Sequence, residues 1–147
     1  MSCHGEQPED GVRRDGELVI ALVGNANVGK SAIFNQLTGL EQAIGNWPGK
    51  TVEKAEGVLL HHGKHIRIID LPGTYSLLAR SEDEKITRGF LLAGRADVIV
   101  NVVDATALER NLFLTVQLLG IGTPVVVALN LVDVARNVLA AEFPDLA

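Results

Sequence analysis

The stretch Leu18-Val19-Ile20-Ala21-Leu22-Val23-Gly24-Asn25-Ala26-Asn27-Val28-Gly29-Lys30-Ser31 decides the fold of this chain. Residues 18–23 form a continuous apolar run, which is typical of a strand buried on both faces of a parallel sheet. Residues 24–31 then fit the pattern G-x-x-x-x-G-K-S/T, and apolar residues recur at helical spacing from residue 30 to residue 38. This order of strand, turn and helix predicts an α/β fold with a ligand-binding loop after its first strand.

The loop at residues 24–31 has the composition of an anion-binding site. Its glycines let the backbone wrap closely around a phosphate, and the positive end of the following helix adds to the attraction. We expect Lys30 to reach the β- and γ-phosphates of a nucleotide and Ser31 to coordinate Mg²⁺. The alternative is a glycine-rich turn with a chance lysine, and the strand and helix on either side argue against it. The nucleotide contacts predicted for this loop are Gly24, Asn25, Ala26, Asn27, Val28, Gly29, Lys30, Ser31 and Ala32.

Strands and helices alternate along the rest of the chain. Apolar runs predict the strands, helical spacing predicts the helices, and residues 40–51 are expected to form a long loop. This order predicts an α/β fold whose sheet is mostly parallel with one antiparallel strand. Within one helix, Leu108, Leu112, Val116 and Leu119 mark an apolar face. The expected strands are 51–60, 64–69, 97–103 and 124–129, and the expected helices are 83–93, 108–119 and 131–141.

Composition narrows the class of protein. The 147 residues suit one domain, and we expect a flexible tail at residues 1–16 and a single domain at residues 17–147. A net charge of −5 lacks the basic surplus of a nucleic-acid-binding protein, so no nucleic-acid partner is expected. The single cysteine cannot form an internal disulfide, which fits a reducing cytoplasm. No apolar run approaches the roughly 20 residues of a membrane-spanning helix, so the chain as given is expected to be soluble.

A second motif, Asp70-Leu71-Pro72-Gly73, follows the apolar strand expected at residues 64–69. The Asp70 carboxylate can hold Mg²⁺ through water, while the N–H of Gly73 can meet a γ-phosphate. Thr51, in the preceding loop, is a candidate to complete the Mg²⁺ shell in the triphosphate state. Taken alone, D-x-x-G also fits an ordinary Asp-Pro-Gly turn. Its place on the strand that follows a phosphate-binding loop favours the metal site.

A third motif, Asn130-Leu131-Val132-Asp133, comes directly after the strand expected at residues 124–129. Its carboxylate can accept hydrogen bonds from both the ring N–H and the exocyclic amine of guanine, and adenine lacks that pair of donors. Residues 101–104 have the same spacing, but Asn101 lies within an apolar strand and is expected to be structural. The later copy therefore predicts guanine recognition and argues against an ATPase.

Three longer strings resemble the ferrous iron transport protein B (FeoB) family, among the Era-type, Ras-like GTPases. They are GNWPGKTVE at residues 45–53, DLPGTYSL at residues 70–77, and residues 104–106 together with 108–112. The resemblance implies a three-layer P-loop NTPase fold and a GTP-hydrolysing G domain at the cytoplasmic face of the inner membrane. It also implies a helical domain, a transmembrane iron-transport region and assembly of oligomers through the transporter. The last strand and helix of such a G domain are expected to be missing from this chain.

The resemblance implies roles for individual residues. Residues 24–31 correspond to the phosphate loop, Thr51 to the first switch, residues 70–73 to the second switch and residues 130–133 to the guanine reader. Ser31, Thr51 and Asp70 are the implied Mg²⁺ ligands. The implied nucleotide contacts beyond the phosphate loop are Gly49, Lys50, Thr51, Asp70, Leu71, Pro72, Gly73, Asn130, Leu131, Val132 and Asp133.

The family is also similar to GTPases that K⁺ activates. The implied ligands of that ion are Asn27 and the backbone from Gly45 to Trp47. Position 74 is Thr, so no Gln follows the second motif to orient the attacking water, and K⁺ near the bond between the β- and γ-phosphates could neutralise the developing charge. We therefore expect slow, K⁺-stimulated hydrolysis. The implied catalytic residues are Lys30, Thr51, Gly73 and Asn27.

Three positions depart from the pattern of the family. Ala26 replaces the usual Pro, Leu131 replaces the usual Met, and Lys50 stands where a small apolar residue is commoner. Two alternatives stay open at the level of sequence. One is a truncated nucleotide-binding module that does not hydrolyse GTP, and the other is an Era-type GTPase with a different role, such as an assembly or RNA-modification factor.

Overall fold

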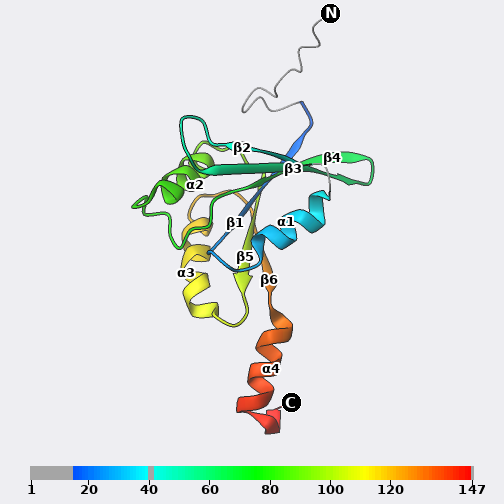
Figure 1. The fold of residues 1–147 in the computed structure, drawn as a ribbon, viewed down its shortest axis with the longest axis vertical. Coiled ribbons are helices and arrows are strands. Elements are labelled where there is room, and N and C mark those ends of the chain that lie inside the picture. Colours follow the sequence, from blue (N-terminus) through cyan, green and yellow to red (C-terminus); the bar gives the residue numbers. More distant parts are fainter. Residues whose placement is uncertain (1–14, 40–41, 147) are drawn as a thin grey trace, which may run out of the picture.

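The computed structural model describes residues 15–39 and 42–146. It places six strands in one sheet of order β2-β3-β4-β1-β5-β6, with helices on both faces (Figure 1). The expected tail at residues 1–16 lies almost entirely outside the described residues. The elements are β1 (Leu18–Gly24), α1 (Lys30–Thr38), β2 (Gln42–Asn46), β3 (Glu53–His61), β4 (Lys64–Asp70), α2 (Glu82–Leu92), β5 (Val98–Asp104), α3 (Leu108–Leu119), β6 (Val125–Asn130), α4 (Val132–Glu142) and a 3-10 turn (Pro144–Leu146).

The central strand of the sheet is β1, and its sequence explains that position. It pairs in parallel with β4 on one side and β5 on the other. Ala21, Leu22 and Val23 have no exposed side-chain surface, as expected for an apolar run covered on both faces. In the described sheet only β3 runs against the other strands, because it is antiparallel to both β4 and β2. The prediction of a mostly parallel sheet with one antiparallel strand is confirmed.

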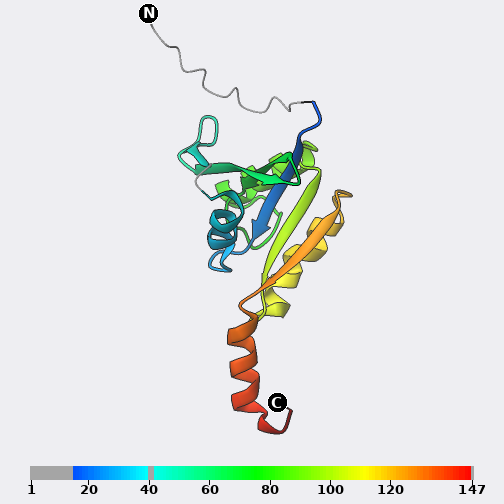
Figure 2. The ribbon, with the colours of Figure 1, turned by 90° about the vertical axis from the view of Figure 1, so that its right-hand side faces the viewer.

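Alternate residues of the central strands face two separate hydrophobic clusters. Leu22 and Ile68 pack with Phe34 of α1, whereas Val23 and Ile69 share a cluster with residues of α2 and α3. Since successive side chains of a strand point to opposite faces, α1 covers one face of the sheet while α2 and α3 cover the other. Figure 2 shows α1 and α3 on opposite sides of the sheet. This gives the three layers that the resemblance implies.

The prediction of a long loop at residues 40–51 is wrong in part, because Gln42–Asn46 form the edge strand β2 and β3 begins at Glu53 rather than at residue 51. A tight turn joins the two strands. The N–H of Lys50 donates to the carbonyl of Trp47 at 2.9 Å, with Pro48 second and Gly49 third in the turn at a φ of +68°. These are features of a type II turn. Residues 43–46 are all exposed, so the sequence offers no alternation of buried and exposed residues to reveal the strand.

Helix α3 lies where it is predicted, but its buried face is a different one. The stripe of Leu108, Leu112, Val116 and Leu119 is exposed, with Val116 at 68 % and Leu119 at 62 %. The residues that face the sheet are Asn111, Leu114, Thr115 and Leu118. The polar members of that face are accommodated by hydrogen bonds: Thr115 donates its hydroxyl proton to Oδ1 of Asn101 on β5, and the side-chain amide of Asn111 donates to the carbonyl of Ala107.

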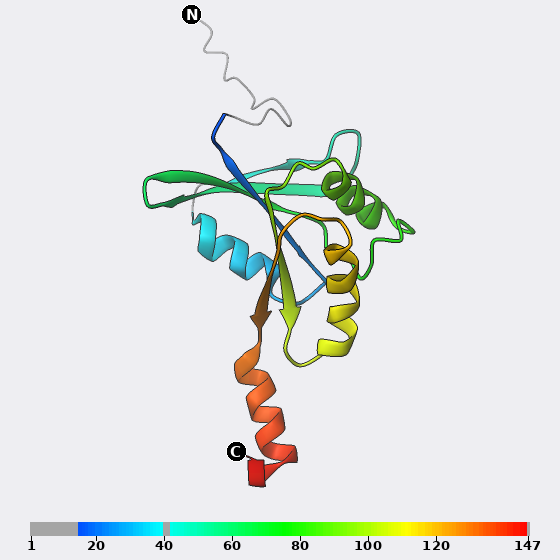
Figure 3. The same ribbon diagram turned by 180° about the vertical axis from the view of Figure 1, so that it is seen from behind.

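The other edge of the described sheet is β6, and helix α4 follows it. Val126, Val127 and Leu129 of β6 are about half exposed, and no residue of α4 is buried. Figures 1 and 3 show α4 extending from the end of the sheet, away from the other helices.

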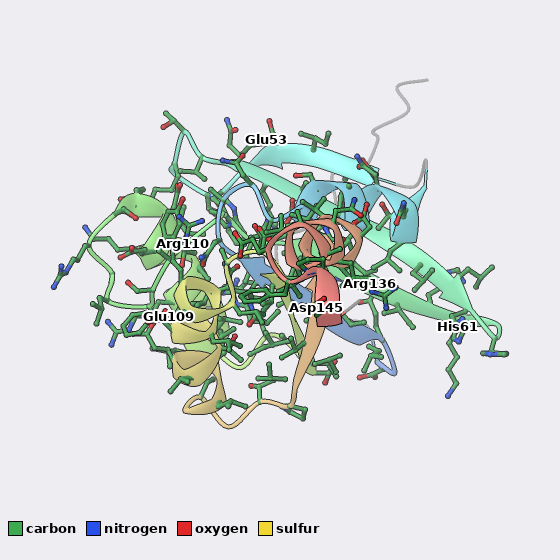
Figure 4. All side chains as sticks on the ribbon, turned by 90° about the horizontal axis from the view of Figure 1, so that it is seen from below. Glu53, His61, Glu109, Arg110, Arg136 and Asp145 are labelled. Atoms are coloured by element: carbon green, nitrogen blue, oxygen red, sulfur yellow. The ribbon has the colours of Figure 1, made fainter. Side chains whose placement is uncertain are left out.

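In Figure 4, which looks up along α4, Glu53 and His61 mark the two ends of β3. None of the helices described for this chain is long and apolar enough to cross a membrane.

Two neighbouring leucines test the orientation of α3. Leu118 is fully buried and Leu119 is 62 % exposed. We expect Leu118→Ala to lower the free energy of unfolding by about 2–5 kcal/mol, because it leaves a cavity in the core, and Leu119→Ala to change it by less than about 0.5 kcal/mol. Urea unfolding followed by circular dichroism measures both. Equal losses for the two variants would contradict the orientation described above.

Candidate functional site

The phosphate-binding loop expected at residues 24–31 connects β1 to α1 at the carboxyl end of the central strand. In open α/β sheets, ligands bind at this end of the strands. The loop turns through two residues of positive φ, Asn27 at +63° and Gly29 at +83°. No acceptor among residues 15–39 and 42–146 receives the N–H groups of Gly29, Lys30 or Ser31. Three neighbouring amides at the positive end of α1 are therefore open to an anion.

The side chain of Lys30 joins this loop to the second motif. It is only 9 % exposed, and its ammonium donates to Oδ1 of Asp70 and to the carbonyl of Leu71, the latter at 2.7 Å. Asp70 is the last residue of β4 and Leu71 follows it. The structure thus brings together two motifs that are 40 residues apart in the sequence.

Gly73, the last residue of the second motif, lies directly against the phosphate loop. A Cβ at this position would lie 3.3 Å from Cα of Ala26, which is tighter than most real contacts. The N–H of Thr74 donates to the carbonyl of Gly24 at 3.0 Å and fixes this approach. Thr74 itself is 2 % exposed, and its hydroxyl donates to the carbonyl of Ser76. The side chain at the position after the motif is thus turned into the protein.

The third motif is anchored to the same loop. Nδ2 of Asn130 donates to the carbonyl of Val28 at 2.9 Å, and an added Cβ on Gly29 would lie 2.2 Å from that nitrogen. Leu131 follows with a φ of +59°, an unusual value for a residue with a branched side chain, and it caps the start of α4. Asp133 is exposed in the first turn of α4. The Asn of this motif therefore touches the phosphate loop, while its Asp faces solvent.

The competing copy of this motif has a structural role, as its place within an apolar strand predicts. Asn101 is 1 % exposed on β5 and donates from Nδ2 to the carbonyl of Val23 on β1 at 3.3 Å. Its Oδ1 accepts the bond from Thr115 of α3. Oδ1 of Asp104 accepts from the N–H of Thr106 at 2.8 Å and from its hydroxyl. These polar groups are already used within the protein.

Thr51 is not brought to the Mg²⁺ ligands predicted with it. It is exposed in the turn between β2 and β3, and no hydrogen bond of the described chain links it to Ser31 or Asp70. The turn lies against α2 instead. Lys50 forms an ion pair of 2.5 Å with Glu82, and the ring of Trp47 meets that of Phe90 edge to face with centroids 5.8 Å apart.

The ion pair between Lys50 and Glu82 is a feature that the sequence does not reveal, because its partners are distant in the chain and no spacing relates them. The hydrogen bond from Lys50 to Glu82 lowers the pKa of that carboxyl below its ordinary value, with the nearby positive charges of Lys50 and Lys85 acting in the same direction. Since the group is exposed, solvent screens this interaction and its contribution to stability is small.

The two parts of the implied K⁺ site also lie apart. Asn27 follows β1, whereas Gly45 belongs to β2 and Trp47 follows it. Strands β3 and β4 stand between β2 and β1 in the sheet, and neighbouring strands are about 4.8 Å apart. In the arrangement described here, the loop from Gly45 to Trp47 would have to move toward Asn27 for the two to share an ion.

Asn25 is a further residue of the loop with an unusual environment. It is 1 % exposed, and neither polar atom of its side chain has a hydrogen-bond partner within the described part of the chain. A buried amide without partners is costly, and such groups are rare in folded proteins. The sequence pattern leaves this position unspecified, so it gives no signal of the burial.

Comparison with known proteins connects this site to a family. The model of the family "Ferrous iron transport protein B" matches residues 18–141. The Fe(2+) transporters FeoB of Salmonella typhimurium and of Escherichia coli K12 are each 51 % identical over 125 residues, which cover 82 % of this chain and 16 % of theirs. This chain thus spans about a sixth of the length of these curated relatives.

Solved structures agree with the sequence matches. The G domain of the T. maritima FeoB iron transporter superposes with a TM-score of 0.79 at 44 % identity, over 87 % of this chain and 83 % of that one. A mutant of S. thermophilus NFeoB bound to GDP gives a TM-score of 0.78 at 51 % identity, over 82 % of this chain and 47 % of that one. At this level of identity, the likeness extends beyond the fold to the sequence.

The close approach of Gly29 to Asn130 gives a test of the site's architecture. Gly29→Ala places a methyl group at the amide of Asn130 and requires an alanine at a positive φ. Gly63→Ala is the matched control, because Gly63 also has a positive φ of +74° but nothing lies within 4 Å of its added Cβ. We expect both variants to lose about 1–2 kcal/mol from the backbone, and Gly29→Ala to lose about 1–1.5 kcal/mol more with the displaced hydrogen bond.

Thermal and urea unfolding of the two variants supply the measurement. Losses of stability that match within error would show that Asn130 does not depend on the absence of a side chain at Gly29.

Proposed function

The chain belongs to the ferrous iron transport protein B family, and from that premise we propose that it is a G domain that binds GTP and GDP with Mg²⁺ and hydrolyses GTP. The observation that carries the proposal is the meeting of three motifs at one loop. Lys30 contacts Asp70 and Leu71, Gly73 lies against Ala26, and Asn130 holds the carbonyl of Val28. The same loop leaves amides open to an anion at the start of α1.

Binding of the nucleotide requires an exchange of partners at Lys30. Its ammonium leaves Asp70 and the carbonyl of Leu71 for the oxygens of the β- and γ-phosphates. Asp70 is then free to face Mg²⁺ together with the hydroxyl of Ser31, the next residue after Lys30. A hydroxyl and a carboxylate are oxygen ligands of the kind that Mg²⁺ prefers, so these residues fit the ion. Once bound, Mg²⁺ would neutralise charge on the phosphate oxygens.

The switch function depends on movement of Thr51 and Gly73. Gly73 already lies at the phosphate loop, where its N–H can meet a γ-phosphate. Thr51 must leave its present place beside α2 to reach Mg²⁺. Hydrolysis removes the γ-phosphate that favours the contacts of Gly73 and Thr51, and the two segments then relax.

The guanine specificity rests on Asp133, which stands three residues after Asn130 and is exposed at the start of α4. Calorimetric titration in K⁺ buffer should show binding of GTP and GDP, and binding of ATP at least about 100-fold weaker, because adenine lacks the donor pair that the carboxylate needs. Absence of binding by GTP and GDP would favour the non-hydrolysing alternative, and a preference for ATP would overturn the assignment of the base.

Asp133→Asn tests the same contact from the side of the protein. The amide that replaces the carboxylate can donate to the C2 carbonyl of xanthine, so affinity should shift from guanine to xanthine nucleotides. Asp145→Asn is the control, because Asp145 is also an exposed aspartate near the end of the described chain. A variant at Asp133 that keeps its full affinity for GTP would contradict the proposal.

We also propose that K⁺ stimulates hydrolysis. Position 74 offers no side chain to the attacking water, since Thr74 is buried and bonded to Ser76. Asn27, by contrast, is exposed at the phosphate loop and has an amide oxygen suited to a monovalent cation. An ion there would neutralise charge that develops near the β- and γ-phosphates.

Rates of phosphate release in K⁺ and in Na⁺ buffers test this part. We expect faster hydrolysis in K⁺, and loss of that difference in Asn27→Ala. Asn137→Ala, at an exposed asparagine on α4, should keep it. Equal rates in the two buffers, or a K⁺ response that survives in Asn27→Ala, would count against the ion.

Iron transport is a property that we propose only for a longer polypeptide containing this domain. The Salmonella and Escherichia coli relatives are Fe(2+) transporters, and this chain covers 16 % of their length. In that setting the domain would act at the cytoplasmic face of the membrane, next to a helical domain and a transmembrane region. No group of three or more potential metal ligands gathers among the described residues.

A further inference from the structure

A cavity of about 340 Å³ lies between the turn that precedes Thr51 and helix α2. Trp47 and Lys50 line it from the turn, and Glu82, Lys85 and Phe90 line it from α2. Its size is at the lower end of the range for sites that hold small organic molecules, about 300–1,000 Å³. None of its lining residues belongs to the phosphate loop or to the guanine motif.

The charge of this cavity is positive in a protein whose net charge is −5. Lys50, Lys85 and Arg95 line it together with a single carboxylate, that of Glu82. Glu82 is already paired with Lys50. No carboxylate of residues 15–39 or 42–146 lies within ion-pair distance of Lys85 or Arg95. Glu82 also interacts electrostatically with Lys85, so one carboxylate faces three cations and the cavity keeps a positive charge.

The floor of the cavity is aromatic. Trp47 and Phe90 are each 7 % exposed, and their rings meet at an interplanar angle of 75°. Lys54 stands 5.2 Å from the centroid of the Trp47 ring and helps to hold it. The indole N–H of Trp47 is buried and has no hydrogen-bond partner among the described residues. Because this nitrogen is itself buried, a ligand in the cavity meets the carbon surface of the two rings.

We propose that this cavity binds a small organic anion, a carboxylate attached to an aromatic or aliphatic ring. Lys85 and Arg95 hold the carboxylate, and the ring packs against Trp47 and Phe90. A second cavity of about 180 Å³ shares Phe90 and Arg95 with the first, and charged side chains line it, among them Lys54, Glu56 and Arg67.

Such a ligand touches both the turn before Thr51 and helix α2, so it would hold that turn in the place described here. This consequence, unlike the site itself, rests on the proposed function, because it matters only if Thr51 moves to a bound nucleotide. The ligand and GTP would then oppose each other's binding, as linkage requires of two ligands that favour different arrangements of one segment.

Phenylacetate is a suitable probe, and Trp47, the only tryptophan of the chain, reports on the site through its fluorescence. We expect a saturable change in the emission of Trp47 on titration with phenylacetate to 50 mM. Acetate lacks the ring and benzyl alcohol lacks the charge. Each should bind with at most a tenth of the apparent affinity of phenylacetate. Lys85→Gln and Arg95→Gln should each weaken binding at least fivefold. Arg88→Gln, at an exposed arginine of α2 that does not line the cavity, should leave it unchanged.

Three results would overturn the site: no saturable change, an equal response to benzyl alcohol, or full affinity in both Lys85→Gln and Arg95→Gln. The titration uses no nucleotide, so these results leave the proposed GTPase activity untouched. A second titration adds a non-hydrolysable GTP analogue with Mg²⁺. Weaker binding of phenylacetate in its presence supports opposition between the ligands, and unchanged binding refutes that consequence alone.

Discussion

The contact between Lys30 and Asp70 is the interaction on which the arrangement of the site depends. Lys30 is 9 % exposed, and a buried ammonium without a counter-charge costs several kcal/mol. Its bonds to Asp70 and to the carbonyl of Leu71 remove that cost and fix the start of α1 to the end of β4. A ligand that takes Lys30 must also satisfy the carboxylate it leaves. A polyphosphate with a divalent cation does both at once, whereas a phosphate or a metal ion alone would leave one charge unpaired.

The link between Asn130 and the phosphate loop imposes a second constraint. Its amide reaches Val28 across the space that a side chain on Gly29 would occupy. The end of β6 and the start of α1 are thus held in one geometry although the residues are 102 positions apart. Because Asp133 stands on the first turn after Asn130, the same contact sets the distance between the loop and the residue that would read a base. In the proposed function, phosphate binding and base recognition would therefore share one rigid support.

The sequence predicted correctly those elements whose structure is determined by residues close to one another in the chain. The apolar run of β1 and the glycines after it left few alternatives, and α1 lies at the predicted residues 30–38. Strand β2 could not be predicted in this way, since it is an exposed edge strand with no buried residue. The apolar stripe of α3 gave a wrong prediction of the buried face of that helix. Asn111 and Thr115 are polar but form hydrogen bonds inside the protein, whereas Val116 and Leu119 are apolar but exposed. Such pairings depend on partners far along the chain.

The place of Thr51 follows from the same kind of distant contact, and its energetics decide how the turn can move. The ion pair of Lys50 with Glu82 is exposed and screened, so it contributes little. Burial of Trp47 against Phe90 is the larger effect, since burying a large side chain contributes about 1.5–3 kcal/mol and an edge-to-face ring pair about 0.5–1.5 kcal/mol beyond it. In the proposed switch, a bound triphosphate must exceed this stabilisation to draw Thr51 to the metal. The aromatic contact, more than the charges around it, therefore holds the turn in the position described here.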